Sequence, residues 1–232
     1  MRTNSISVLV VAIAVGLFGA ACGNRASNNA TAYTNTNRNA NSNTADHDMS
    51  NIRANDMSNM QGESMMNMKS DPGAAQQPFD LQFLDTMTQH HNDAIMMAKM
   101  VLGKSQRTEL KTFAQKIIDD QTKEIGHMKQ LRDRWYADKP FAKNMEMPGM
   151  ADSMKMVSAE RMQEMDKMES NQFDINFLDM MTAHHQGAVT MAKQAEQKAE
   201  HAEIKELAAQ IIKAQQPEIE QMQKWKAAWG SK

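Results

Sequence analysis

Two stretches of the chain place a pair of adjacent histidines between methionines, and the two stretches are copies of one another. Residues three and four apart lie on the same side of a helix, so the methionine before each pair can face the same ion as either histidine. The methionine after each pair lies further along the helix and could join a cluster, but not easily one tight mononuclear site. These residues are Met87, His90, His91 and Met97 in the first copy, and Met181, His184, His185 and Met191 in the second.

Imidazole and thioether side chains without cysteine favour copper over zinc, calcium or magnesium. Thioethers are soft ligands that select Cu(I), and imidazole accepts copper in either oxidation state. The helix that follows each pair offers one further methionine, Met128 in the first copy and Met222 in the second. The pattern therefore predicts a copper site and no organic cofactor.

Helical phase separates the two histidines of each pair. At about 100° per residue, the first histidine falls inside the apolar stripe and the second lies at its edge. The apolar stripe of the following helix contains a glutamine and a glutamate in both copies. A carboxylate on such a stripe is costly unless it is paired, so we expect it to orient the inward histidine for metal binding. The expected pairs are His90 with Glu124 and His184 with Glu218, and the glutamines are Gln121 and Gln215.

Two metal-free roles are also compatible with these residues. A core histidine bonded to a buried glutamate needs no metal, and the helical face would then dock an envelope partner. This structural alternative predicts fully buried histidines paired to Glu124 and Glu218, with no side-chain cluster open to an ion. The second role is that of an oxidant sink, in which exposed methionines are oxidised and sulfoxide reduction restores them. It predicts protection from oxidants that survives loss of all four histidines.

Enzymatic chemistry finds little support in the sequence. Glu124 and His127 have the Glu-x-x-His spacing of di-iron bundles, but the second copy has Gln221 where a histidine is needed. The chain contains no nucleophile elbow, phosphate-binding loop or His-Glu-x-x-His zinc motif. A formal net charge of −2, without a basic stripe, argues against nucleic acid as a partner. We therefore expect a protein that is not an enzyme.

Four amphipathic helices must position these residues. Apolar stripes of helical period predict helices over residues 78–103 and 106–136, and the pattern repeats within residues 171–229. Pro217 is expected to kink or interrupt the last helix. One helical hairpin cannot bury its own apolar face, so two tandem hairpins predict an all-α four-helix bundle. The hairpin repeats cover residues 78–138 and 172–232.

The connector between the hairpins, residues 139–171, is rich in methionine. Its first part, Met145 to Met156, is split by Pro148-Gly149 and predicts a loop with exposed thioethers. Its second part carries methionines three to four residues apart, which could be either the apolar edge of a short helix or metal ligands. These are Met162, Met165 and Met168.

The N-terminus predicts export and anchoring. Arg2 precedes an apolar run that is too short for a good membrane span and ends in small residues before Cys22, the only cysteine. Residues 1–22 therefore predict a lipoprotein-type signal peptide with Cys22 as the lipidated residue, and an ordinary secreted protein with one free thiol is the alternative. We expect an exported protein, attached by its lipid to a bacterial membrane and facing the periplasm or the cell exterior.

Residues 23–77 predict a tether. Its first part is rich in Asn, Ser and Thr and has almost nothing apolar to bury, so it is expected to be disordered. Its second part adds methionines on a polar background, which predicts either a flexible arm that binds soft metals or a low-complexity linker without function. The residues of this arm are His47, Met49, Met57, Met60, Met65, Met66 and Met68.

The duplicated motif resembles that of a known family. It reads Phe-Leu-x-x-Met-x-x-His-His-x-x-Ala-(Ile/Val)-x-Met-Ala over residues 83–98 and 177–192, and is similar to the bacterial family called domain of unknown function 305. The resemblance covers residues 79–135 and 173–229 and implies two tandem copies with a ferritin-like fold. Members studied as periplasmic copper-binding proteins imply copper binding and tolerance, with Met87, His90, His91, Met97, Met181, His184, His185 and Met191 as the matching residues. The leading hypothesis is thus an envelope protein that buffers Cu(I) or passes it to other copper-handling envelope proteins.

Overall fold

The structure is a computed structural model that describes residues 69–230, and every regular element within this range is a helix. The predicted all-α class is therefore confirmed. The four long helices are α2 (Phe79–Lys104), α3 (Thr108–Tyr136), α6 (Ser170–Lys198) and α7 (Ala202–Trp229). The short ones are η2 (Ala74–Gln76), α4 (Met150–Met156) and α5 (Ala159–Asp166).

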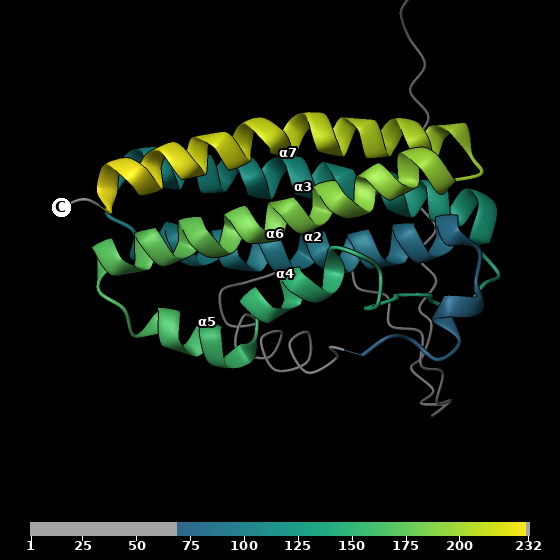
Figure 1. The fold of residues 1–232 in the computed structure, drawn as a ribbon, viewed down its shortest axis with the longest axis horizontal. Helices are drawn as coiled ribbons and strands as arrows, with labels where there is room; N and C mark the ends of the chain where they lie inside the picture. Colours follow the sequence, from purple (N-terminus) through teal and green to yellow (C-terminus); the bar gives the residue numbers. More distant parts are fainter. Residues whose placement is uncertain (1–68, 231–232) are drawn as a thin grey trace, which may run out of the picture. The chain divides into compact units, whose positions relative to one another are not determined.

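The long helices form two hairpins that pack into a four-helix bundle. Helix α2 packs along α3, α6 packs along α7, and α2 and α6 join the two hairpins (Figure 1). Side chains of α3 and α7 also meet, since Lys116 pairs with Glu218 and the Phe113 ring packs edge-on against Trp225. Each hairpin thus buries its apolar face against the other, as the sequence pattern predicts.

The two hairpins share the core crosswise. One part of the core combines the first half of α2 with the second half of α6, as in Phe83 and Met191. The other part combines the second half of α2 with the first half of α6, as in Val101 and Phe177. Opposite halves of α2 and α6 can meet in this way only if the two helices run antiparallel. Equivalent residues of the two copies therefore approach one another where α2 and α6 cross.

Equivalent aspartates fix this crosswise arrangement at both ends. Asp80, in the first turn of α2, accepts hydrogen bonds from the backbone N–H groups of Glu200 and His201, just before α7. Its counterpart Asp174, in the first turns of α6, pairs with Arg107 just before α3, with an Nε–Oδ2 distance of 3.2 Å. Each aspartate thus ties the start of one hairpin to the turn of the other.

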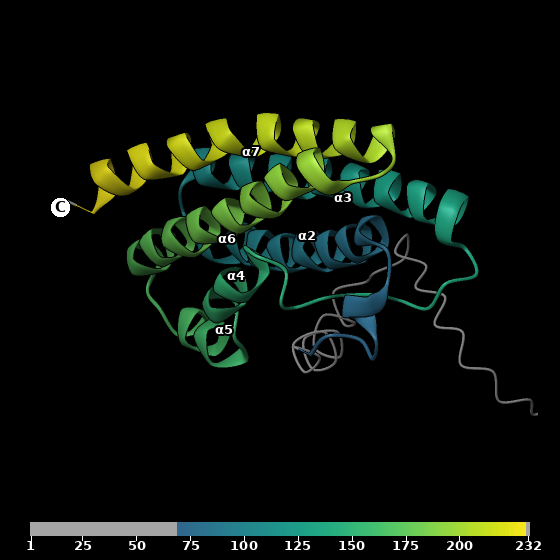
Figure 2. The same cartoon turned by 45° about the vertical axis from the view of Figure 1, so that its right-hand side comes forward.

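The connector folds back onto the bundle. Helices α4 and α5 pack on α6, on the side away from α7 (Figures 1 and 2). The prediction of a loop with exposed thioethers is wrong, because Met145, Met147 and Met150 are buried in the same core part as Phe83. Methionine is apolar and flexible enough to fill such a space. Further along, Met162 and Met165 are buried on α5 and Met168 is partly buried, as expected of a helix edge.

Helix α7 continues through Pro217 without a break. An interruption at this residue, one of the two predicted outcomes, is therefore wrong. Proline removes one backbone hydrogen bond, and buried residues on both sides of it, such as Ile211 and Met222, hold the helix against the bundle.

Residues 69–230 contain no helix that is long and apolar enough to cross a membrane. The predicted signal peptide, Cys22 and the arm from His47 to Met68 lie outside the described residues, so these expectations stay predictions.

The close approach of α4 to α6 depends on Gly187. A Cβ atom at this position would collide with Ser153 Oγ and with the backbone of Gly149, which itself has a positive φ of 96°. We expect Gly187→Ala to lower the free energy of unfolding by about 1–3 kcal/mol, because the neighbours that must shift include backbone. The matched control is Gly126→Ala in α3, where nothing lies within 4 Å of the added Cβ.

Replacing a glycine in an open helix interior should stabilise the protein by about 0.5–1 kcal/mol. Denaturant unfolding of both variants measures the difference. Equal effects of the two substitutions would show that α4 is not held against α6 in this way.

Candidate metal site at the crossing of α2 and α6

Two histidines from the two copies stack where α2 crosses α6. The ring centroids of His90 and His184 are 3.6 Å apart with an interplanar angle of 34°, and both side chains are buried. Desolvation by burial, with the neighbouring histidines adding to it, keeps the pKa of both rings well below the ordinary value of 6.5. Both rings are therefore neutral, and each carries one nitrogen lone pair.

The second histidine of each pair faces its own hairpin. His91 Nε2 lies 2.6 Å from Glu124 Oε2, and His185 Nε2 lies 3.0 Å from Glu218 Oε2. The predicted pairing of these carboxylates with His90 and His184 is therefore wrong. The reason is geometric: the first histidine points between the hairpins toward the other copy. The second, at the edge of the stripe, points at the neighbouring helix of its own hairpin.

Five ring nitrogens of these histidines are buried and have no hydrogen-bond partner among residues 69–230. A buried polar group without a partner costs about 1–3 kcal/mol, so native proteins seldom keep several together. Those of the five that carry a lone pair are suited to accept a metal ion, so the residues present fit a soft or borderline cation. The five atoms are Nδ1 of His90, His91 and His185, and both Nδ1 and Nε2 of His184.

The six predicted methionine ligands are all fully buried and lie in two sets on either side of the histidines. One set belongs to the core part with Phe83, the other to the part with Val101. Within residues 69–230, no group of three or more His, Cys, Asp or Glu side chains is placed to hold an ion. The predicted methionine ligands are therefore divided between two parts of the core and do not form one finished centre. The sets are Met87, Met128 and Met191, and Met97, Met181 and Met222.

Two glutamines also lie on the inner face, as predicted. Gln121 and Gln215 are buried one turn before Glu124 and Glu218. The Oε1 atom of Gln121 and both side-chain polar atoms of Gln215 have no hydrogen-bond partner in the part of the chain that the structure describes. No hydrogen bond within residues 69–230 therefore shows the expected role of these glutamines in orienting the histidines. Their unpaired atoms add to the buried polar groups that could contact a bound ion or its ligands.

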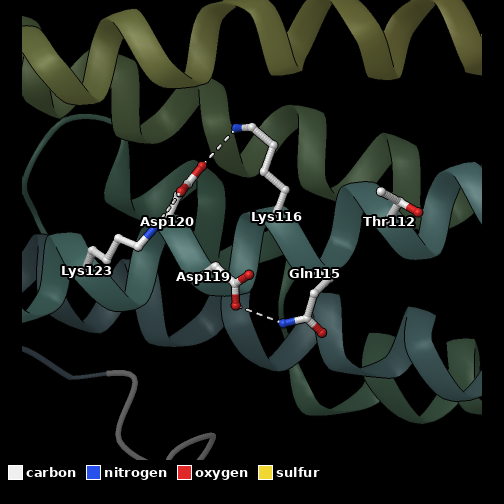
Figure 3. A pocket seen from close by; sticks show the side chains of 6 residues that line it. All are labelled: Thr112, Gln115, Lys116, Asp119, Asp120 and Lys123. Atoms are coloured by element: carbon white, nitrogen blue, oxygen red, sulfur yellow. Dashed lines mark hydrogen bonds and ion pairs between the residues drawn. The ribbon is translucent and has the colours of Figure 1, made fainter.

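A lysine makes the two copies unequal. Lys116 Nζ lies 2.7 Å from Glu218 Oε1 and 2.9 Å from Asp120 Oδ2. Figure 3 shows Lys116 extended toward Asp120 on the surface of α3. Burial alone would raise the pKa of Glu218, but the hydrogen bonds and charges of His185 and Lys116 lower it below the ordinary 4.5.

The position equivalent to Lys116 in the second copy is Gln210, which carries no charge. Sequence reasoning missed the role of Lys116, because a lysine four residues before an aspartate predicts only a solvated pair on one helix.

A serine of the connector also reaches the histidines. Ser153 Oγ, on α4, lies 3.0 Å from His90 Nε2 and 2.7 Å from the carbonyl oxygen of Gly149. The side chain is buried. No sequence pattern signals this contact, since the polar residues around Ser153 predict an exposed loop.

Asp93, two residues after His91, should make the stability of the fold depend on pH. Burial raises the pKa of its carboxyl group to about 7, against about 3.9 in an unfolded chain. Between these values the folded state holds a proton that the unfolded state releases, so stability falls as pH rises from about 4 to about 7. Asp93→Asn keeps an acceptor for Gln89 Nε2, 2.9 Å from Oδ1.

We expect Asp93→Asn to stabilise the protein by about 2 kcal/mol above neutral pH and by little near pH 4. Denaturant unfolding at a series of pH values tests this, with the exposed Asp119→Asn as the control. Unfolding curves of Asp93→Asn that follow the wild-type pH dependence would contradict it.

The comparison with protein families adds the decisive observation. The family described as domain of unknown function (DUF305) matches residues 80–226. This chain belongs to the DUF305 family. The match includes both hairpins in one continuous stretch, so the expectation that each hairpin is a separate copy of the DUF305 domain stays a prediction. No curated protein matches the chain.

Solved structures of similar proteins include metal-bound ones. CopM in the Cu(II)-bound form is 36% identical, with 65% of this chain and 97% of CopM covered and a TM-score of 0.55. The Cu(I)-bound form is 35% identical, with 65% and 96% covered and a TM-score of 0.53. A DUF305 protein from Streptomyces coelicolor, described as secreted, is 29% identical, with 66% and 93% covered and a TM-score of 0.54.

Proposed function

We propose that this DUF305 protein binds copper, with Cu(I) as its preferred ion, and catalyses no reaction. The observation that carries the proposal is the layer of four buried histidines with five unpaired ring nitrogens. This layer lies between two sets of buried methionines. A purely structural core has no use for that many unpaired nitrogens, whereas a metal ion can bind those of them that carry a lone pair.

The relatives support the choice of metal. CopM is known in copper-bound forms with both Cu(II) and Cu(I), and this chain covers nearly all of it at about one-third identity. A copper-related role follows from that similarity. The preference for Cu(I) rests on this chain's own methionines, because thioethers bind Cu(I) better than Cu(II).

The histidines would supply nitrogen ligands and the methionines thioether sulfur. Glu124 and Glu218 hold the rings of His91 and His185 through their Nε2 atoms, and such carboxylate partners orient a ligand and raise its basicity. A bound ion would draw ligands from the histidine layer and from a neighbouring methionine set. Such a set of ligands suits a protein that buffers copper or transfers it to other copper-handling proteins of the envelope.

The location in the envelope is also part of the proposal. It rests on the lipoprotein-type signal and Cys22 in the sequence, and on the description of the Streptomyces coelicolor relative as secreted. The methionines of the arm before residue 69 would give the same ion a further set of thioether ligands.

One observation favours the structural alternative. His91 and His185 are fully buried and bonded to Glu124 and Glu218, as a metal-free helical module would have them. Among residues 69–230, His90 and His184 have no carboxylate partner, and this favours a metal site over a purely structural core. The oxidant-sink hypothesis needs exposed methionines, and the connector methionines that could have served, Met145, Met147 and Met150, are buried.

X-ray absorption spectroscopy of the copper-loaded full chain tests the proposed ligands. We expect both imidazole nitrogen and thioether sulfur around Cu(I), and a loss of the imidazole contribution in the His90→Ala/His184→Ala variant. A copper environment without imidazole, or one that is the same in the variant, would overturn the proposed site.

A further inference from the structure

Ser153 joins the connector to the histidine layer, and its hydroxyl group has a single proton to give. We propose that Ser153 is a positioning residue that fixes the tautomer of His90, with the proton on Nε2 and the lone pair on Nδ1. The part of this inference that concerns metal rests on the proposed function. The tautomer itself does not.

The direction of each hydrogen bond follows from the groups around Ser153 Oγ. The carbonyl oxygen of Gly149 lies 2.7 Å away and can only accept, so the hydroxyl proton points to it. The carbonyl oxygen of His184, at 3.5 Å, is again an acceptor. Only a lone pair of Oγ is then left to face His90 Nε2 at 3.0 Å. For a hydrogen bond to form there, Nε2 must carry the proton.

The lone pair of His90 therefore lies on Nδ1. In a neutral imidazole ring one nitrogen is protonated and the other carries the lone pair, so a proton on Nε2 leaves the lone pair on Nδ1. The Nδ1 atom is buried, and no group within residues 69–230 forms a hydrogen bond with it and so competes with a metal ion for its lone pair.

The same arrangement holds for two of the other rings. His91 and His185 face carboxylate oxygens through Nε2, and their Nδ1 atoms are buried and unpaired. Three of the four rings thus give Nε2 to an acceptor and keep Nδ1 free. His184 differs, because neither of its nitrogens has a hydrogen-bond partner within residues 69–230, and either nitrogen can carry the lone pair.

The position of Ser153 is set by the backbone around it. Helix α4 begins after Gly149, which lies against Gly187 of α6 so closely that neither residue could carry a Cβ. This contact places Ser153 beside both His90 and the backbone of His184. A serine in a mobile loop could not select a tautomer, whereas a serine on a helix that packs closely against α6 can.

Nuclear magnetic resonance of the metal-free full chain with ¹⁵N-labelled histidine tests the proposal directly. Long-range ¹H–¹⁵N correlation separates protonated from unprotonated ring nitrogens, and His90→Gln assigns the His90 signals. We expect a protonated Nε2 and an unprotonated Nδ1 in His90. An unprotonated Nε2, or an even mixture of tautomers, would overturn the proposal without any bearing on copper binding.

A matched pair of variants tests the role of the hydroxyl group. Ser153→Ala is expected to let His90 populate both tautomers and to weaken Cu(I) binding about tenfold, as loss of a group that orients a ligand does. The control is Ser158→Ala in the same connector, whose hydroxyl caps α5 by accepting from the Arg161 N–H. Wild-type tautomer signals in Ser153→Ala would contradict the proposal.

Binding of the diamagnetic ion Ag(I) separates this inference from the proposed function. We expect a change in the Nδ1 signal of His90 on titration. A change at Nε2 instead would overturn the assigned ligand atom and leave metal binding intact. A spectrum that does not respond to Ag(I) would count against the proposed function, while the metal-free spectrum would still decide the tautomer.

Discussion

Replacing His184 with leucine is expected to stabilise the metal-free protein by about 1 kcal/mol and to weaken Cu(I) binding by about tenfold or more. Both ring nitrogens of His184 are buried without a partner among the described residues, so the ring costs free energy that a leucine of similar size does not. Loss of the stacked contact with His90 offsets part of the gain, by about 0.5–1.5 kcal/mol. Denaturant unfolding and a copper competition titration measure the two effects.

The neighbouring histidine is the matched control. His185→Leu removes the hydrogen bond to Glu218 and leaves that buried carboxylate with Lys116 alone. We expect it to destabilise the protein by about 1–3 kcal/mol. If His184→Leu destabilised as much as His185→Leu and left copper affinity unchanged, His184 would be a core residue and not a ligand.

Replacing four methionines with leucine should weaken Cu(I) binding about a hundredfold, which is a loss of about 2.8 kcal/mol. The variant changes Met87, Met97, Met181 and Met191, the methionines that flank the histidine pairs in both copies. Leucine keeps the apolar volume, and each such exchange usually costs less than about 1.5 kcal/mol of stability. Binding of Cu(II), which depends on imidazole more than on thioether, should fall much less. Competition titrations with both oxidation states measure the change.

The control removes methionines of the same kind that lie on a connector helix and not on the helices that carry the histidines. Met162 and Met165 are buried on α5 in the connector. Their replacement by leucine should leave Cu(I) affinity within about threefold of the wild type. Equal losses of affinity in the two variants would mean that general changes in the core, and not the loss of sulfur ligands, lower the affinity.

The bundle could be predicted from the sequence because local pattern determines it. The apolar stripe with Phe83, Met87 and His90 has the period of a helix, and its repetition in the second copy requires two hairpins that cover one another. The same phase correctly separates the two histidines of each pair. It could not assign the partners of Glu124 and Glu218, because that depends on how far each helix is rotated in its hairpin.

Contacts between distant segments could not be predicted. Ser153 reaches His90 only because Gly149 and Gly187 let α4 lie close to α6, and nothing in the local pattern signals that approach. Lys116 reaches Glu218 across two hairpins in the same way. The polar residues around the connector methionines predict a loop, whereas the fold has apolar space for these methionines to fill.

The buried histidine nitrogens without partners lower the stability of the fold, and in the proposed function they serve as metal ligands. Two pairs of equivalent residues on the antiparallel helices α2 and α6 form the buried layer of His90, His91, His184 and His185. Carboxylates form hydrogen bonds with only two of these rings. Such unsatisfied polar groups are usually removed by selection for stability unless they serve a function.

A Cu(I) competition titration of the full chain against its His90→Ala/His91→Ala/His184→Ala/His185→Ala variant tests most directly whether the histidine layer binds copper. Far-ultraviolet circular dichroism checks that the variant keeps its helices, and His127→Ala, a half-buried histidine outside the duplicated pairs, serves as the control. We expect stoichiometric binding by the wild type that is weakened about a hundredfold or more in the quadruple variant and unchanged in the control. Equal Cu(I) affinity of the wild type and a folded quadruple variant would contradict a copper site at these histidines.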